Sequence, residues 1–308
     1  MFVNPLDSKC SILCVLLLTV AVSFVHAQDQ DFDQVQIETV KVADGVYMLV
    51  GSGGNIGVST GEDGVFMIDD QFAPLTDKIK AAIAEVSDKS VHFVLNTHWH
   101  FDHVGGNENM GEAGAVIVAH ENVRKRMSTE QFIEFFNQKL PPSPKVALPV
   151  ITFTRDVTFH LNGDETYVFH VENAHTDGDA IIHFREANVM HMGDIYFAGM
   201  YPFIDVSSGG SVNGIIAAVS RVLTMIDETT KIIPGHGPLS NKSELKGYLN
   251  MLTSIRDQIS QHINAEKTLE DVLTSKPTHE FDTDWGHSFL KPDQFVEILY
   301  KDLSRGQK

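Results

Sequence analysis

The sequence predicts a mixed α/β protein. Segments whose apolar residues recur at every second position, typical of strands, alternate with segments whose apolar residues recur at every third or fourth position, typical of helices. In both halves of the chain, moreover, a strand pattern is followed by a residue of a metal-binding type and then by a helix pattern. Periodicity alone does not define how these elements are stacked.

The first half of the chain is interpreted as two hairpins followed by a β-α-β unit. Residues 37–50 alternate around Asp44-Gly45, and residues 57–69 alternate around the glycines of 61–64, as strands joined by tight turns do. Between them, the glycines of 51–55 permit positive φ and predict a mobile loop. The elements expected next are a helix at 76–86, a strand at 91–95, a short helix at 107–113, a strand at 115–119 and a helix, in one or two pieces, at 121–136.

The second half begins with a proline-rich stretch, 138–149, interpreted as a surface excursion rather than a domain linker because residues of metal-binding types lie on both sides of it. Leucines and isoleucines spaced by three and four in 242–265 predict a long helix whose apolar stripe packs into the core. The other expected elements are strands at 157–161, 166–171, 180–184, 189–192 and 231–233, and helices at 213–226, 268–274 and 292–303.

The stretch from His98 to His103 carries the strongest functional signal. Side chains two apart in extended backbone point the same way, so His98 and His100 can hold one ion at the end of the strand 91–95. Asp102 and His103 face elsewhere and suit a second ion about 3.5–4 Å from the first. Chance clustering in a chain with 15 histidines is the alternative, but functional side chains favour such strand ends.

This motif, followed by two glycines, resembles the signature of the metallo-β-lactamase superfamily of dinuclear metal hydrolases. The resemblance extends over residues 37–239 and includes His175, Asp194 and His236, in matching order and approximate spacing. It implies a four-layer α/β/β/α sandwich, with two sheets between outer helices.

The resemblance also implies a ligand set for two divalent metal ions. The first ion would be held by His98, His100 and His175, the second by Asp102, His103 and His236, and Asp194 would bridge the two. Zinc suits the imidazole-rich first site, and iron or manganese remain alternatives at the second. Two such ions lower the pKa of a shared water from about 15.7 towards about 7, which predicts hydrolysis with Asp102 or Asp194 relaying the proton.

The substrate expected is an ester-like carbonyl compound, a lactone or a thioester. Asp194 resembles the glyoxalase II and lactonase branches, since one β-lactamase group has a cysteine near this position and another has serine without a bridging carboxylate. Between Asp194 and Lys231 the only cation is Arg221, so the lysine that anchors a β-lactam carboxylate has no evident counterpart. A β-lactam-hydrolysing enzyme and a metal-binding protein without turnover are the alternatives.

Several weaker candidates surround this set. Asp69 either orients a ligand, as the Asp common there in the family does, or caps its strand. Phe203, with Met200 and Tyr201, is a candidate apolar wall over the metals. The hydroxyls that can replace a missing lysine are those of Tyr196, Tyr201, Ser207, Ser208 and Ser211. The histidines interpreted as core or sheet residues are His120, His160, His170, His183 and His191.

The N-terminal segment is interpreted as a secretory signal peptide, residues 1–27, cleaved after Ala27. Its apolar run is shorter than the roughly 20 residues that span a membrane, although an uncleaved anchor is the alternative. Cys10 and Cys14 both lie within it, so the mature domain, 28–308 with a helical portion at 242–308, has no disulfide. Cys14 lies near the start of the apolar run, whereas a lipidated cysteine would follow that run, so Cys14 is a poor lipid acceptor. A secreted or periplasmic protein is therefore expected.

The formal net charge of −18 disfavours nucleic-acid and anionic-membrane partners, which require basic patches. A small-molecule substrate is the partner that remains. Nothing in the sequence predicts the oligomeric state.

Overall fold

The computed structural model describes Met1 and residues 31–305 of the 308-residue chain. The predicted signal peptide and both cysteines lie outside these described residues, apart from Met1. Within the described part of the chain, no helix is both long enough and apolar enough to cross a membrane.

The first sheet has seven strands in the order β1-β2-β3-β4-β5-β6-β9. The predicted hairpins form its antiparallel half, closed by turns in which Gly45 and Gly64 adopt positive φ. β4, β5, β6 and β9 are parallel, as expected for strands joined by helical crossovers. The strands are β1 (Glu38–Ala43), β2 (Val46–Val50), β3 (Ile56–Gly61), β4 (Gly64–Ile68), β5 (Val91–Leu95), β6 (Val116–His120) and β9 (Ile151–Phe153).

The second sheet has six strands in sequence order from β10 to β15. All of its neighbours are antiparallel except β13 and β14, which are parallel and are joined through helix α5 (Val212–Met225). The strands are β10 (Asp156–Leu161), β11 (Asp164–His170), β12 (Ala180–Phe184), β13 (Val189–His191), β14 (Lys231–Ile233) and β15 (Ser240–Asn241).

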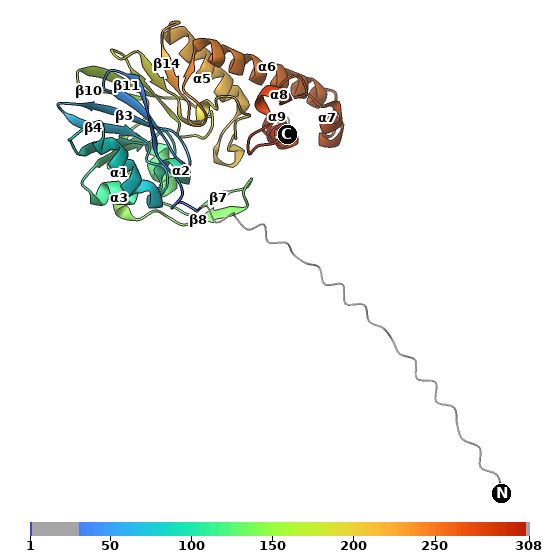
Figure 1. The fold of residues 1–308 in the computed structure, drawn as a ribbon. Coiled ribbons are helices and arrows are strands. Elements are labelled where there is room, and N and C mark those ends of the chain that lie inside the picture. Colours follow the sequence, from blue (N-terminus) through green and yellow to red (C-terminus); the bar gives the residue numbers. More distant parts are fainter. Residues whose placement is uncertain (2–30, 306–308) are drawn as a thin grey trace. The chain divides into compact units, whose positions relative to one another are not determined.

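The two sheets pack face to face between outer helices, which confirms the predicted α/β/β/α sandwich (Figure 1). Phe66 and Ile68 of the first sheet meet Ile182 of the second in the central core. Helix α1 (Thr76–Ala84) buries Ile79 and Ile83 against the outer face of the first sheet. The other helices in the first half of the chain are α2 (Phe101–Val104), α3 (Asn107–Glu112) and α4 (Glu121–Met127).

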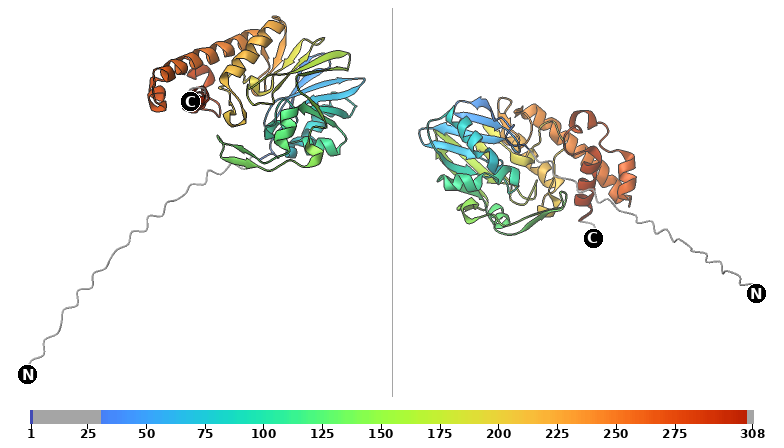
Figure 2. Two further views of the ribbon diagram at one scale, coloured as in Figure 1. Left: turned by 180° about the vertical axis from the view of Figure 1, so that it is seen from behind. Right: turned by 60° about the horizontal axis from the view of Figure 1, so that its bottom comes forward.

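The C-terminal helices continue the layer that α5 begins on the side of the second sheet: the long helix at 242–264 packs against α5, and the last helix packs against that long helix (Figure 2). The predicted stripe of α6 (Lys242–Asn264) is buried, with Leu245, Leu252 and Ile259 fully inaccessible, so its interpretation as core packing is confirmed. Asp302 accepts hydrogen bonds from the Ser211 hydroxyl and the Val212 amide, which joins the last helix to the start of α5. The remaining helices are α7 (Leu269–Ser275), α8 (Asp282–Trp285) and α9 (Pro292–Ser304).

The helix predicted at 121–136 is wrong in its second part. Helix α4 ends at Met127, where the Ser128 hydroxyl donates to the Arg124 carbonyl, and a two-stranded hairpin follows it. The hairpin consists of β7 (Gln131–Ile133) and β8 (Gln138–Leu140), so the predicted surface excursion at 138–149 begins with a strand. Strands of three residues are too short for their alternation to be recognised against a helical period.

Candidate metal centre

The seven predicted ligand residues come together at the ends of strands from both sheets. His98 follows β5, His175 lies in the loop after β11, Asp194 lies just beyond β13, and His236 follows β14. Their side chains form two groups. The first cluster is His98, His100, His175 and Asp194; the second cluster is Asp102, His103 and His236.

In the first cluster, hydrogen-bond partners define the tautomers of two histidines. His100 Nε2 lies 3.1 Å from an Asp205 carboxylate oxygen, and His175 Nδ1 lies 2.8 Å from the Phe203 carbonyl, so both of these nitrogens are donors. The opposite nitrogens, His100 Nδ1 and His175 Nε2, therefore carry lone pairs, and they face each other at 2.9 Å. Two lone pairs this close repel unless a cation lies between them.

His98 and His103 are oriented through Asp69. The Thr97 hydroxyl donates to Asp69 at 2.7 Å, which leaves its oxygen to accept from His98 Nδ1 at 3.0 Å. His103 Nδ1 donates to the same carboxylate at 2.8 Å. The Nε2 atoms of both rings consequently point into the clusters, and the buried His98 Nε2 has no hydrogen-bond partner among the described residues.

Asp194 faces both clusters with different oxygens. Its Oδ2 lies 3.5 Å from His175 Nε2 and 3.8 Å from His98 Nε2, whereas its Oδ1 lies 3.0 Å from His103 Nε2 and 3.4 Å from His236 Nε2. Asp102 completes the second cluster, with Oδ2 3.3 Å from His236 Nε2. A carboxylate that offers one oxygen to each group is the arrangement a bridging ligand requires.

Electrostatics differ between the two clusters. Burial lowers the pKa of His98, and it lowers the pKa of His175 to about 4, so both imidazoles are neutral near pH 7. Burial would also lower the pKa of His236, but the carboxylates of Asp194 and Asp102 outweigh it and raise this pKa to about 9. The Asp194 and Asp102 carboxylates likewise raise the pKa of His103 against the effect of burial. Ions at the second cluster must therefore displace protons.

The residues fit two divalent metal ions. Imidazole nitrogens with lone pairs and a buried carboxylate are the donors that zinc and related metals take. The convergent lone pairs, the unpartnered His98 Nε2 and the two-sided Asp194 all require positive charge in the space they surround.

The orienting residues were only partly predicted. Asp69 does orient His103, as predicted, and holds a positive φ of 62°, a strained backbone of the kind that persists where contacts over-determine it. Asp205 and the Phe203 carbonyl were missed. The one signal for Asp205 is an acidic residue within the otherwise apolar, glycine-rich segment that follows Asp194.

The glycine-rich segment 51–55 packs between the two ligand loops. The Asn55 side chain donates to the carbonyls of Pro234 and Gly237, which flank His236, and the Gly54 amide donates to the Asp102 carbonyl. A Cβ at Gly54 would overlap the His103 ring. These glycines thus permit close approach to the ligands, and the segment is fixed by hydrogen bonds rather than mobile as predicted.

Of Met200, Tyr201 and Phe203, which were predicted to form an apolar wall over the metals, Phe203 is the residue whose ring packs beside the ligand histidines. Its ring centroid lies 5.9 Å from that of His100 and 5.8 Å from that of His175. Tyr201 instead donates its hydroxyl to Asp282, near the C-terminal helices. Three of the other proposed hydroxyl anchors are engaged elsewhere: Tyr196 with Ser240, Ser207 with Asp205, and Ser211 with Asp302. Ser208 is buried, and its backbone amide donates to Asp205.

The other histidines are sheet or core residues in the structure, as predicted. The rings of His120 and His170 stack at 3.8 Å, and the buried His191 contacts the Asn55 carbonyl. His160 is an exposed residue of β10, and His183 is half-buried in β12. None of them belongs to either cluster.

The sequence matches the model of the metallo-beta-lactamase superfamily over residues 49–245, and the chain belongs to this family, as its motifs predicted. Hydroxyacylglutathione hydrolase from Pelagibacter ubique (strain HTCC1062) is 26% identical over 163 residues, which cover 51% of this chain and 57% of that enzyme. The chain thus spans little more than half the length of this relative.

Solved structures show the same fold at low sequence identity. A metallo-beta-lactamase from Pontibacter korlensis superposes with a TM-score of 0.58 at 18% identity, covering 71% of this chain and 99% of that one. The inverting sec-alkylsulfatase from Pseudomonas sp. superposes with a TM-score of 0.68 at 14% identity, covering 86% of this chain and 50% of that one.

Proposed function

We propose that this protein is a dinuclear metal-dependent hydrolase that cleaves an ester-like carbonyl, a lactone or a thioester, in a small-molecule substrate. The observation that carries the proposal is the convergence of imidazole lone pairs on two adjacent clusters that Asp194 joins. Family membership and the likeness to a hydroxyacylglutathione hydrolase support hydrolysis, and the latter supports a thioester.

The seven ligand residues would have two roles, which are to hold the metal ions and to transfer protons. Two divalent ions would polarise the scissile carbonyl and activate water for attack. His98, His100 and His175 would hold the first ion, Asp102, His103 and His236 the second, and Asp194 both. The Asp102 side chain is 20% exposed and Asp194 only 5%, so Asp102 is the better placed of the two to pass a proton to solvent.

The surroundings of the clusters favour an uncharged substrate over a β-lactam. Within residues 31–305, no lysine or arginine forms an ion pair or hydrogen bond with any of the seven ligand side chains. Arg221, the one cation between Asp194 and Lys231, lies over the Phe169 ring at 4.1 Å, in a separate cavity with Arg155. A β-lactam carboxylate would enter the site without a cation to pair with, which costs transition-state binding.

A substrate panel tests the proposal. We expect kcat/KM for a homoserine lactone or a neutral N-acetylcysteamine thioester to equal or exceed that for a cephalosporin, a carbapenem and a phosphodiester, in zinc-loaded protein. His98→Ala is the matched control and should abolish turnover of every substrate. A β-lactam cleaved tenfold faster than all ester-like substrates would contradict the substrate class, and metal binding without any turnover would favour a non-catalytic protein.

We further propose that the protein is exported and begins near Gln28. The apolar run and the small residue at Ala27 support this. Mass spectrometry of protein made in a secreting host should show the mature N-terminus, whereas an intact chain in the membrane fraction would mean an anchor.

A further inference from the structure

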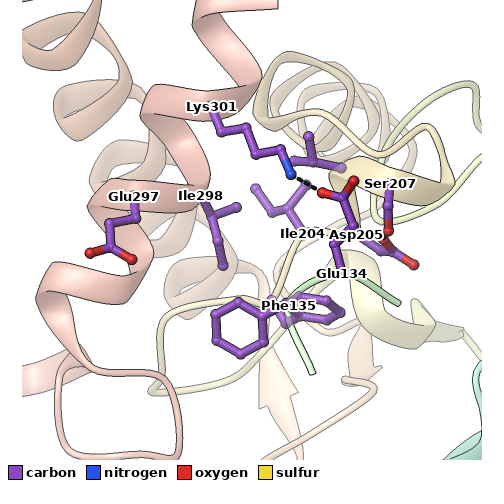
Figure 3. A pocket seen from close by; sticks show the side chains of 10 residues that line it. Glu134, Phe135, Ile204, Asp205, Ser207, Glu297, Ile298 and Lys301 are labelled. Atoms are coloured by element: carbon purple, nitrogen blue, oxygen red, sulfur yellow. Dashed lines mark hydrogen bonds and ion pairs between the residues drawn. The ribbon is translucent and has the colours of Figure 1, made fainter. Parts of the chain in front are cut away.

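A cavity of about 250 Å³ lies between the β7–β8 hairpin, the segment 203–207 and helix α9 (Figure 3). In Figure 3, Ile298 and Lys301 project from α9 toward Phe135 and Glu134 of the hairpin. Five of its ten lining residues are apolar, and these are Phe135, Phe203, Ile204, Val206 and Ile298.

This cavity borders the first cluster. Phe203 forms one of its walls, and the same ring packs about 6 Å, between centroids, from His100 and His175. Asp205 also lines it while orienting His100 at 3.1 Å. Phe203 and Asp205 therefore contact both the cavity and the ligands of the first cluster, which places the cavity next to the metal centre.

The hairpin extends the apolar wall from the cavity toward solvent. The rings of Phe135 and Phe136 each lie 5.2 Å from Phe203, yet the two residues are 37% and 43% exposed. Exposed aromatic side chains grouped beside a cavity mark a binding surface more often than a solvated one.

The charges around the cavity leave no partner for an anion. Lys301 is paired with Glu134, and the Asp205 carboxylate faces His100. The remaining charged lining residue is Glu297, which is acidic. Among the described lining residues, the one cation is already paired with a carboxylate. An anionic group on the substrate would therefore be repelled.

We infer that this cavity and the aromatic wall of Phe135, Phe136 and Phe203 bind the apolar acyl chain of the substrate, so that medium-length acyl esters or thioesters are preferred over short or anionic ones. The inference rests on the proposed function. A cavity of about 150 Å³ is enough to hold benzene, so this one accommodates an alkyl chain or a ring.

The test uses the zinc-loaded full chain and neutral N-acetylcysteamine thioesters with butyryl and octanoyl groups. A buried methylene contributes up to about 0.8 kcal/mol, which is a factor of about 4 in kcat/KM. The octanoyl group has four more methylenes than the butyryl group. If each raises kcat/KM about 2- to 4-fold, the octanoyl thioester should be cleaved with a kcat/KM about 16- to 250-fold higher. The double variant Phe135→Ala/Phe136→Ala should reduce the octanoyl-to-butyryl ratio at least fivefold. Phe132→Ala, on the same hairpin and 45% exposed but outside the cavity, should leave the ratio unchanged.

A wild-type ratio near one, or equal ratios in the double variant and in Phe132→Ala, would overturn the inference while the proposed function stands. Absence of any thioester, lactone or ester turnover would overturn the proposed function instead. In that event, comparing the affinities of octanamide and acetamide by calorimetry still tests whether the cavity binds an alkyl chain, because this measurement needs no turnover. Preference for octanamide that is lost in the double variant supports the subsite, and equal binding refutes it.

Discussion

Substituting Gly54 by alanine tests how the glycine-rich segment supports the second cluster. The Gly54 amide donates to the Asp102 carbonyl, and an added Cβ would overlap the His103 ring. His103 is fully buried between Asp69 and Asp194, so the ring has no free space into which it can move without losing one of these contacts. We therefore expect the variant to displace a ligand of the second cluster selectively.

The size of the effect follows from the packing. Forcing an extra methyl group into a well-packed site costs about 1–3 kcal/mol. If that cost falls on the position of His103, the dissociation constant for metal at the second cluster rises about 5- to 150-fold. The three atoms nearest to an added Cβ at Gly54 all belong to His103, which is not a member of the first cluster, so the first cluster should keep its affinity.

Stepwise zinc titration of stripped protein, followed by calorimetry, measures both affinities. Gly247→Ala is the matched control, because a Cβ there meets nothing within 4 Å. That change lies inside α6 and should leave metal binding intact while stabilising the fold by about 0.5–1 kcal/mol. Unchanged second-site affinity in Gly54→Ala, or equal weakening of both sites, would refute the reasoning.

Three further outcomes follow from the contacts. Asp205→Ala should weaken metal binding at the first cluster about 10- to 100-fold because His100 loses its orienting partner, and Asp205→Asn should restore part of it, as measured by competition with a chelator. Because the pKa of His236 is raised to about 9 and that of His103 is raised as well, bound metal displaces protons from both rings, so zinc affinity at the second cluster of stripped protein should rise at least about tenfold per pH unit between pH 7 and pH 9; a pH-independent affinity would contradict this. Arg126→Ala breaks a bidentate pair with the partly exposed Asp177 and should lower the free energy of unfolding by about 1 kcal/mol without changing metal content, as denaturant titration would show.

Most of the secondary-structure elements and the metal-ligand set could be predicted from local sequence patterns. Strands and helices of five or more residues show their period directly, and β5 and β12 begin and end where the pattern predicts. The ligands could be found because four of them lie within six residues at a strand end, and the family signature supplied the distant three. Their assembly into two clusters is what the structure adds.

Contacts between distant segments could not be predicted in this way. Asp205 meets His100 across 105 residues, and Lys301 meets Glu134 across 167. The pattern of apolar and polar residues within a segment does not indicate such pairs, because it contains no information on which distant polar residue each partner contacts. The hairpin that carries Phe135 was assigned to a helix for a related reason, because its stability comes from pairing and from packing on Phe203 rather than from local propensity.

The most direct test of the central claim is the return of activity as stripped protein is titrated with zinc. Thioester or lactone turnover should increase until two equivalents of zinc per chain are bound, and Asp194→Ala should remain inactive at any ratio because both clusters lose a ligand. Full activity at one equivalent would contradict the two-metal site, and activity that is independent of metal would contradict the account as a whole.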